Sequence, residues 1–304
     1  MPFEVAPLAP HIGSRITGLD LSQDMSEPTM RSLIDLLFDR GVLVIPAQTI
    51  DHAAYVRLAN FFGRPLDFFI PEQCDADFPA IIRIDNDPAT PLVLRDGAVQ
   101  WHSDSSYEAV PAAVTMLYGK EAPDRGGETH FASTVAAYAA LPDDMKSKLD
   151  GLIAHHELGR APWIDGEVVP DPKRPPRKTD SPSHPLIMVH PITGRKGIFT
   201  SGTAYAIEGM GDAEGTALIR QLREHIVQPQ FRLEYKIVPG DIVLWDNFGA
   251  VHCATRIEYS ADDGKRRLLY RISTKGSPSL CPQADSAPVR AARSGASQSG
   301  RCAG

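Results

Sequence analysis

The sequence lacks the features that would direct it to a membrane or to a nucleic acid. It contains no run of about 18 or more apolar residues, so we expect no transmembrane helix. The first residues, Met1 to Val5, have neither the basic start nor the apolar core of a signal peptide. Basic residues are outnumbered, with 31 Lys and Arg against 38 Asp and Glu, which gives a formal net charge of −7. We therefore expect no membrane partner and no nucleic-acid partner.

Cysteine is also scarce. The four cysteines are scattered over the chain and form no C-x-x-C pair: Cys74, Cys253, Cys281 and Cys302. This spacing does not favour a disulfide framework, and it is typical of a protein in a reducing, cytoplasmic compartment.

The remaining composition is that of a globular protein, with 42% hydrophobic residues among 304. We expect one domain over residues 1–276. Residues 277–304 are rich in Ser, Ala, Gly and Arg and are predicted to be a disordered tail. Residues 162–184 carry many Pro and charged residues without apolar periodicity, which predicts a long loop, and loops of this length are often lids over a binding site.

Apolar spacing predicts a few helices among many short strands. The predicted helices cover residues 28–40, 51–62, 133–149 (interrupted at Pro142) and 212–226. The predicted strands cover residues 16–21, 42–45, 81–84, 113–118, 129–131, 187–189, 197–200, 231–237, 241–245 and 268–273. This order indicates a mainly β fold with flanking helices (α+β), built around an antiparallel double-sheet barrel.

The segment Trp101-His102-Ser103-Asp104 contains a candidate metal site. On a strand, residues two apart point to the same side, so His102 and Asp104 could bind one ion together. The best third ligand is His252, which follows the predicted strand over residues 241–245. Two imidazoles and one carboxylate on one face of an octahedral ion are typical of a non-haem Fe(II) site with positions left for a cosubstrate and O₂.

Other interpretations of these three residues remain open. An H-x-D pair occurs often by chance, and His252 is one of 10 histidines. Zinc also takes His and carboxylate ligands, and the protein would then be a hydrolase. A barrel that binds a sugar or an anion without catalysis would need no metal at all.

Two arginines follow His252 on a predicted strand. Alternation puts Arg267, Leu269 and Arg271 on one face. Guanidinium groups directed into a barrel are costly unless each pairs with an anion, and Arg suits planar carboxylates. The alternative is a basic strand face in contact with solvent.

These segments together resemble one known family. The motifs, in chain order, are W-H-S-D-S-S-Y (101–107), G-G-E-T (126–129), H-P-x-x-G-R-K (190–196), G-D-I-V-L-W-D-N (240–247), His252 and R-R-L-L-Y-R (266–271). In order and spacing the chain resembles the Fe(II)/2-oxoglutarate-dependent dioxygenases of the taurine dioxygenase and 2,4-dichlorophenoxyacetate dioxygenase family, from about Ile16 to Lys275. The resemblance implies a double-stranded β-helix (jelly-roll) core.

The resemblance also implies roles for five residues. His102, Asp104 and His252 match the iron ligands of the family. Arg267 matches the arginine that binds the distal carboxylate of 2-oxoglutarate, and Thr129 matches the hydroxyl that assists it. The implied reaction consumes 2-oxoglutarate and O₂, hydroxylates a small organic substrate, and releases succinate and CO₂. In some members the hydroxylated product then breaks at a carbon–heteroatom bond.

The substrate implied by the resemblance is an organic anion. Arg271 matches a position that faces the substrate's anionic group, and Ser105 matches a substrate-pocket position. The segment W-H-S-D-S-S-Y looks closer to aryloxyalkanoate dioxygenases than to taurine dioxygenase, and position 98 is Ala rather than an amide. We expect an aryloxyalkanoate-like carboxylate, with a sulfonate or alkyl sulfate as the alternative. The resemblance also implies a homo-oligomer.

Overall fold

The computed structural model describes residues 3–67, 71–90, 98–158 and 182–280. Residues 162–181 of the predicted loop and residues 281–304 of the predicted tail lie outside this part of the chain. The prediction of a loop is wrong for its last residues, because β9 (Ser183–Pro185) pairs with a neighbouring strand and buries His184.

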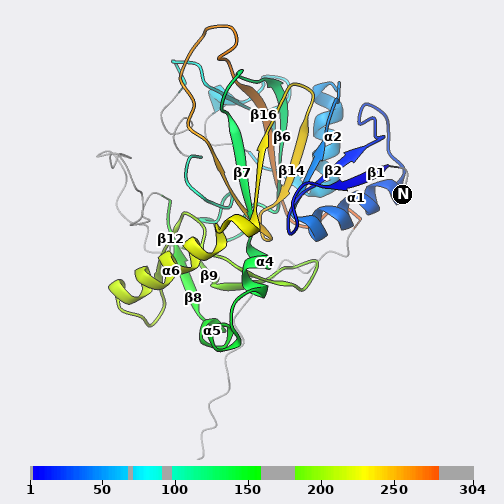
Figure 1. The fold of residues 1–304 in the computed structure, drawn as a ribbon. Coiled ribbons are helices and arrows are strands. Elements are labelled where there is room, and N and C mark those ends of the chain that lie inside the picture. The colour runs from blue at the N-terminus through cyan, green and yellow to red at the C-terminus, as the bar shows by residue number, and fades with distance from the viewer. Residues whose placement is uncertain (1–2, 68–70, 91–97, 159–181, 281–304) are drawn as a thin grey trace, which may run out of the picture.

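A large sheet forms the centre of the fold (Figure 1). Its strands run in the order β1, β2, β3, β14, β6, β16, β4, and β5 pairs with β16 beside this path. All of these pairs are antiparallel except β2 with β3. The strands are β1 (Glu4–Pro7), β2 (Ser14–Thr17), β3 (Val42–Ile45), β4 (Arg64–Pro65), β5 (Ile82–Asp85), β6 (Val114–Glu121), β14 (Ile242–Asp246) and β16 (Leu268–Lys275).

Three smaller sheets complete the β structure of the described residues. One has the order β13 (Arg232–Lys236), β7 (Glu128–Ser133), β15 (Ala250–Ala254). The second has the order β12 (Ala204–Ile207), β8 (Ile153–His156), β9, and the third pairs β10 (Ile187–Val189) with β11 (Lys196–Ile198). The sheet-dominated α+β class predicted from the sequence is confirmed.

Local sequence signals set the helix ends. α1 (Glu27–Arg40) begins where the Ser26 hydroxyl accepts a hydrogen bond from the N–H of Thr29, and it ends at Gly41, whose φ of 71° favours glycine. α2 (His52–Phe62) begins at Asp51, which caps it in the same way. The helix predicted over 133–149 is two, split at Pro142. Elsewhere in the described ranges, the helices are α4 (Thr134–Ala139), α5 (Asp143–Leu149), α6 (Asp212–Ile226) and the 3₁₀ turns η1 (Pro71–Gln73) and η2 (Pro229–Phe231).

One predicted strand is misplaced. The strand expected over residues 16–21 is β2, which ends at Thr17. Gly18 follows with a φ of 84°, a left-handed conformation that interrupts extended backbone. None of the described helices is both long and apolar enough to cross a membrane.

Strand β14 explains how the central sheet positions the site. Ile242 and Leu244 pack into the core under α1 and α2, whereas Val243 and Trp245 pack on the other face with Phe131 of β7. Side chains alternate along a strand, so this continuous apolar run is buried on both faces. The second face, between the central sheet and the β13–β7–β15 sheet, is where the candidate site lies.

Candidate metal and cosubstrate site

A short bridge brings the two predicted histidine ligands together. His102 and His252 exchange backbone hydrogen bonds of 2.9 Å in both directions, as an isolated antiparallel pair. His252 belongs to β15, so its position is fixed by the sheet. The two imidazole rings lie with their centroids 4.2 Å apart.

The prediction that His102 and Asp104 lie on one strand is wrong. Beyond the His102 bridge the chain turns over Asp104–Tyr107, and Ser105 adopts a φ of 53°. Asp104 still faces the histidines because its backbone N–H donates to the Asn247 side-chain oxygen at 3.1 Å. The hydrogen bond to Asn247, rather than the alternation of side chains along a strand, therefore directs Asp104 to the same side as His102.

The three predicted ligands converge. Nε2 of His102 lies 3.7 Å from Oδ1 of Asp104, and Nε2 of His252 lies 3.8 Å from Oδ2. One ligand atom from each residue lies within 4.8 Å of the others. In the described part of the chain, no other cluster of three or more His, Cys, Asp or Glu residues meets this criterion.

The protonation states suit metal binding. Burial lowers the pKa of His102 and lowers that of His252 well below its usual value, which keeps both imidazoles neutral. Burial alone would raise the pKa of Asp104, but the charge of Arg271 and the hydrogen bond from Thr115 act against it, and the pKa lies far below its usual range. Two neutral imidazoles and one carboxylate are the forms that ligate a metal, so the donor set fits Fe(II).

Arg271 lies against the carboxylate ligand. Its Nη2 donates to Oδ1 of Asp104 at 2.8 Å, and its Nε donates to the Ser273 hydroxyl at 3.1 Å. The side chain keeps 24% of its surface exposed. The predicted substrate-facing arginine is thus within the site, with one of its contacts made to the metal ligand itself.

The Thr129 hydroxyl is buried without a partner. Thr129 lies in the middle strand of its sheet, opposite Tyr235 and Ala254. Its side-chain oxygen makes no hydrogen bond within the described residues. A buried polar group without a partner is costly, so this hydroxyl is free to hydrogen-bond a group that binds in the site.

Arg267 lies beside this hydroxyl's strand. A Cβ atom at Gly127 would lie 3.5 Å from the Arg267 Cδ, which is an ordinary van der Waals contact, so the Arg267 side chain packs against this turn. The φ of 80° at Gly127 is what favours glycine there. Burial lowers the pKa of Arg267 to about 10, and the guanidinium forms no ion pair with any residue that the structure describes. The backbone N–H of Arg267 donates to the Asn86 side-chain oxygen at 2.7 Å, which fixes the start of β16. The partly buried guanidinium of Arg267 and the unpartnered hydroxyl of Thr129 could both donate hydrogen bonds to a carboxylate such as that of 2-oxoglutarate.

Ser105 lies in the turn next to Asp104 and is partly buried. Its side chain hydrogen-bonds Tyr107, whose pKa burial raises. Sequence reasoning missed Tyr107 as a separate candidate, although it belongs to the quoted motif. It also missed Thr115 on β6 and Asn247 in the turn after β14, which both contact Asp104.

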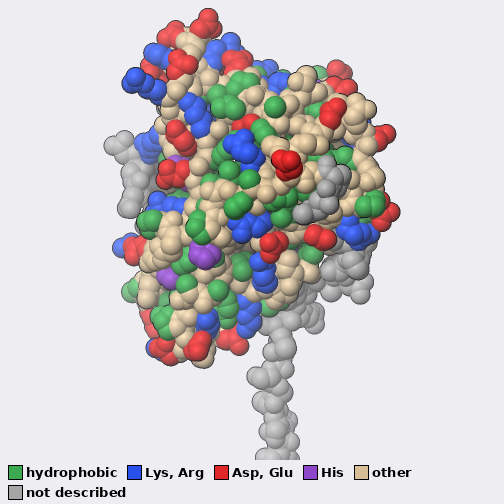
Figure 2. Space-filling model, turned by 45° about the vertical axis from the view of Figure 1, so that its right-hand side comes forward, with side chains coloured by type: hydrophobic (Ala, Val, Ile, Leu, Met, Phe, Trp, Pro, Cys, Tyr) green, Lys and Arg blue, Asp and Glu red, His purple; other side chains and the backbone are tan. Residues whose placement is uncertain are grey.

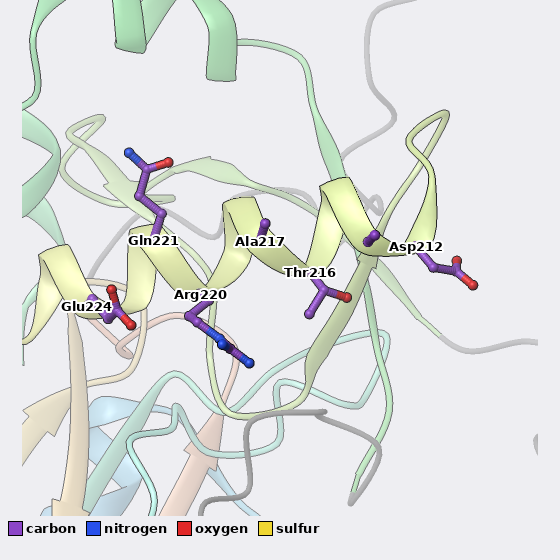
Figure 3. A pocket seen from close by; sticks show the side chains of 7 residues that line it. Asp212, Thr216, Ala217, Arg220, Gln221 and Glu224 are labelled. Atoms are coloured by element: carbon purple, nitrogen blue, oxygen red, sulfur yellow. The ribbon is translucent and has the colours of Figure 1, made fainter.

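A shallow hollow along α6 is a separate feature (Figure 3). The side chains that line it all come from this helix: Asp212, Ala213, Thr216, Ala217, Arg220, Gln221 and Glu224. It contains no imidazole and none of the predicted site residues. The chemistry of the chain therefore points to the histidine–carboxylate site.

Comparison with known proteins agrees with this site. The model of the "Taurine catabolism dioxygenase TauD, TfdA family" matches residues 4–273. The chain is 30% identical to an (S)-phenoxypropionate/alpha-ketoglutarate-dioxygenase of Sphingobium herbicidovorans, over 91% of this chain and 96% of the relative. It is 31% identical to an alpha-ketoglutarate-dependent 2,4-dichlorophenoxyacetate dioxygenase of Cupriavidus pinatubonensis, over 88% and 96%.

A solved structure extends the similarity to the fold. The crystal structure of AAD-2 in complex with Mn(II) and N-oxalylglycine superposes with a TM-score of 0.72 at 26% identity, covering 90% of this chain and 97% of that one. The chain belongs to the TauD, TfdA dioxygenase family. It is a 2-oxoglutarate-dependent non-haem iron dioxygenase, an oxidoreductase that uses Fe(II), 2-oxoglutarate and O₂.

Proposed function

We propose that His102, Asp104 and His252 hold Fe(II), and that Arg267 and Thr129 bind the distal carboxylate of 2-oxoglutarate. The observation that carries this proposal is that β7 holds the unpartnered Thr129 hydroxyl, while Arg267, which approaches Gly127 at the start of that strand, forms no ion pair within the described residues. Fe(II), 2-oxoglutarate and O₂ together would supply the oxidising chemistry, in which one oxygen atom of O₂ enters the substrate as a hydroxyl and the other enters succinate, with release of CO₂.

The protein's own contribution is to position the reactants. Arg267 and Thr129 orient one end of the cosubstrate by charge-assisted hydrogen bonds. The turn that carries Asp104 and Ser105 offers the substrate a wall beside the metal ligands. The zinc hydrolase and the binding barrel weighed from the sequence have no use for this second pair of residues.

For the substrate, we propose a small aryloxyalkanoate-like carboxylate. Relatives named for phenoxypropionate and 2,4-dichlorophenoxyacetate support this class, and Arg271, which stays partly exposed beside the metal ligands, supplies a cation for an organic anion. In Figure 2, acidic and basic side chains are mixed over the visible face, which favours a small-molecule partner over a polyanion. Sulfonates and alkyl sulfates are the second class to test.

The test is succinate release by the purified protein with Fe(II), 2-oxoglutarate and ascorbate. Candidate substrates are aryloxyacetates, aryloxypropionates, alkanesulfonates and alkyl sulfates, each at the same concentration. We expect the aryloxyalkanoates to stimulate succinate release most, in proportion to substrate consumed. Greater stimulation by a sulfonate or sulfate would overturn the substrate proposal and leave the reaction class intact.

We further propose that the two facing sheets form a double-stranded β-helix within one domain over residues 1–276. The similarity in fold to AAD-2 and the antiparallel pairing of the central strands support this. The part of the predicted lid over residues 162–184 that precedes β9 remains a prediction, as do a cytoplasmic location and a homo-oligomer. Light scattering of the purified protein tests the oligomer directly.

A further inference from the structure

A closed ring of hydrogen bonds surrounds the Asp104 carboxylate. The Thr115 hydroxyl donates to Oδ2 of Asp104 at 2.6 Å. The same hydroxyl lies 3.0 Å from Nδ2 of Asn247 and 2.9 Å from the hydroxyl of Ser273. Arg271 closes the ring, because it contacts both Ser273 and the other carboxylate oxygen.

Proton counting fixes the direction of every bond in this ring. The Thr115 hydroxyl has one hydrogen, which goes to the carboxylate, so its oxygen must accept from Asn247 and Ser273. Ser273 gives its hydrogen to Thr115 and therefore accepts from Arg271. The Asn247 side-chain oxygen accepts from the Asp104 backbone and from the Trp245 indole N–H at 3.1 Å, so its NH₂ group faces Thr115.

The two donors to the carboxylate differ in rigidity. Thr115 is fully buried on the central strand β6, on the same face as Leu117, and its β-branched side chain has few rotamers. Arg271 is long and partly exposed, and it also has the proposed role toward the substrate anion. Thr115 is thus the donor that stays in place when Arg271 moves.

We propose that Thr115 is a positioning residue for the metal site, whose hydroxyl fixes the rotation of the Asp104 carboxylate. Asn247 and Ser273 orient that hydroxyl. The fixed rotation keeps one carboxylate oxygen beside each histidine, at the 3.7 Å and 3.8 Å separations described above. Hydrogen-bond partners of metal ligands typically change metal affinity by 10- to 100-fold when they are removed.

The test measures metal affinity in the ligand-free protein. Mn(II) is the probe, and its dissociation constant is measured by calorimetry and by the electron paramagnetic resonance signal of free Mn(II). Thr115→Val keeps the shape and removes the donor, so we expect Mn(II) to bind about 10-fold or more weakly. Thr115→Ser restores a hydroxyl and should stay within about 3-fold of the wild type.

Thr274→Val is the matched control. Thr274 is a buried threonine on β16 whose hydroxyl donates to the Val114 carbonyl at 3.1 Å and does not reach Asp104. It should lose stability but keep the wild-type Mn(II) affinity. Wild-type affinity in Thr115→Val, or an equal loss in Thr274→Val or in Thr115→Ser, overturns the proposal.

Ser273→Ala provides a second measurement if Thr115→Val does not fold. It leaves Thr115 in place but removes one of the two groups that orient the hydroxyl, so a smaller loss of affinity is expected. Unchanged affinity in that variant then overturns the proposal. The inference rests on the proposed metal site, and the two fail differently: retained Mn(II) binding in His252→Ala removes the site, whereas retained binding in Thr115→Val removes only the role of Thr115.

Discussion

Replacing Thr129 with valine should weaken 2-oxoglutarate binding while stabilising the ligand-free protein. The two effects have opposite signs because the Thr129 hydroxyl has no hydrogen-bond partner within the described residues. Valine fills nearly the same space and removes the unpartnered group. Few substitutions at a binding site combine these two outcomes, so the pair of measurements is diagnostic.

The magnitudes follow from the burial of this hydroxyl. Thr129 is 3% exposed, and a buried hydroxyl without a partner costs about 1–3 kcal/mol in proteins. Thr129→Val removes this unpartnered hydroxyl, so its free energy of unfolding should be higher by part of that amount. The melting temperature should then rise by about 2 °C for each kcal/mol. A hydrogen bond to a charged carboxylate contributes about 1.5–3 kcal/mol, so the KM for 2-oxoglutarate should rise about 10- to 150-fold.

The assay combines thermal unfolding without ligand and succinate formation at varied 2-oxoglutarate. Thr274→Val serves again as the control, because its hydroxyl is hydrogen-bonded in the structure and its loss should lower stability by about 1 kcal/mol. A wild-type KM in Thr129→Val would remove Thr129 from the cosubstrate site. A loss of stability as large as that of Thr274→Val would mean that the hydroxyl has a partner after all.

Three further predictions concern the ligands, the cosubstrate cation and a buried histidine. Asp104→Ala and His252→Ala should each abolish substrate-dependent succinate formation with an unchanged circular dichroism spectrum, and full activity in either variant excludes that residue as a ligand. Arg267→Ala should raise the KM for 2-oxoglutarate by about 30-fold or more, from about 2–5 kcal/mol of lost pairing, with little change in the KM for substrate; equal changes in both would contradict its role. Burial lowers the pKa of His156 well below its usual value, so the unfolded chain binds the proton more tightly and the free energy of unfolding should fall as pH drops below about 6.5, by up to about 1.4 kcal/mol per pH unit. The free energy of unfolding, measured by denaturant titration at several pH values, should depend less on pH in His156→Gln than in the neighbouring variant His155→Gln. An equal pH dependence in both variants would mean that His156 is not the source of the effect.

Much of the fold could be predicted because its signals are local. Ser26 and Gly41 mark the ends of α1, Asp51 marks the start of α2, and Pro142 divides the segment between α4 and α5. Capping and proline effects act over a few residues, so the sequence alone contains them. The strand predicted over 16–21 missed its end because Gly18 was not recognised as the turn.

The site shows where local signals stop. The residues His102, Asp104 and His252 were found from their chemistry and from the order of the motifs, and the structure brings them together. The reason given for the first pair was wrong, because the backbone turns at Asp104 and the contact with Asn247 directs its side chain. The chemistry of a residue can be read from the sequence at its own position. The direction of its side chain in a turn depends on contacts with residues that are distant in the sequence.

The sequence by itself determined which residues could perform the chemistry: two histidines, a carboxylate, a hydroxyl and two arginines in a characteristic order. Only the tertiary structure decided that Arg271 and Thr115 donate hydrogen bonds to the Asp104 carboxylate, and that Asn247 donates to the Thr115 hydroxyl. Thr115 and Asn247 lie 132 positions apart in the chain and meet because β6 pairs with β14. Strand pairing brings distant residues into contact through the register of the whole sheet, and no local pattern of residues encodes that register.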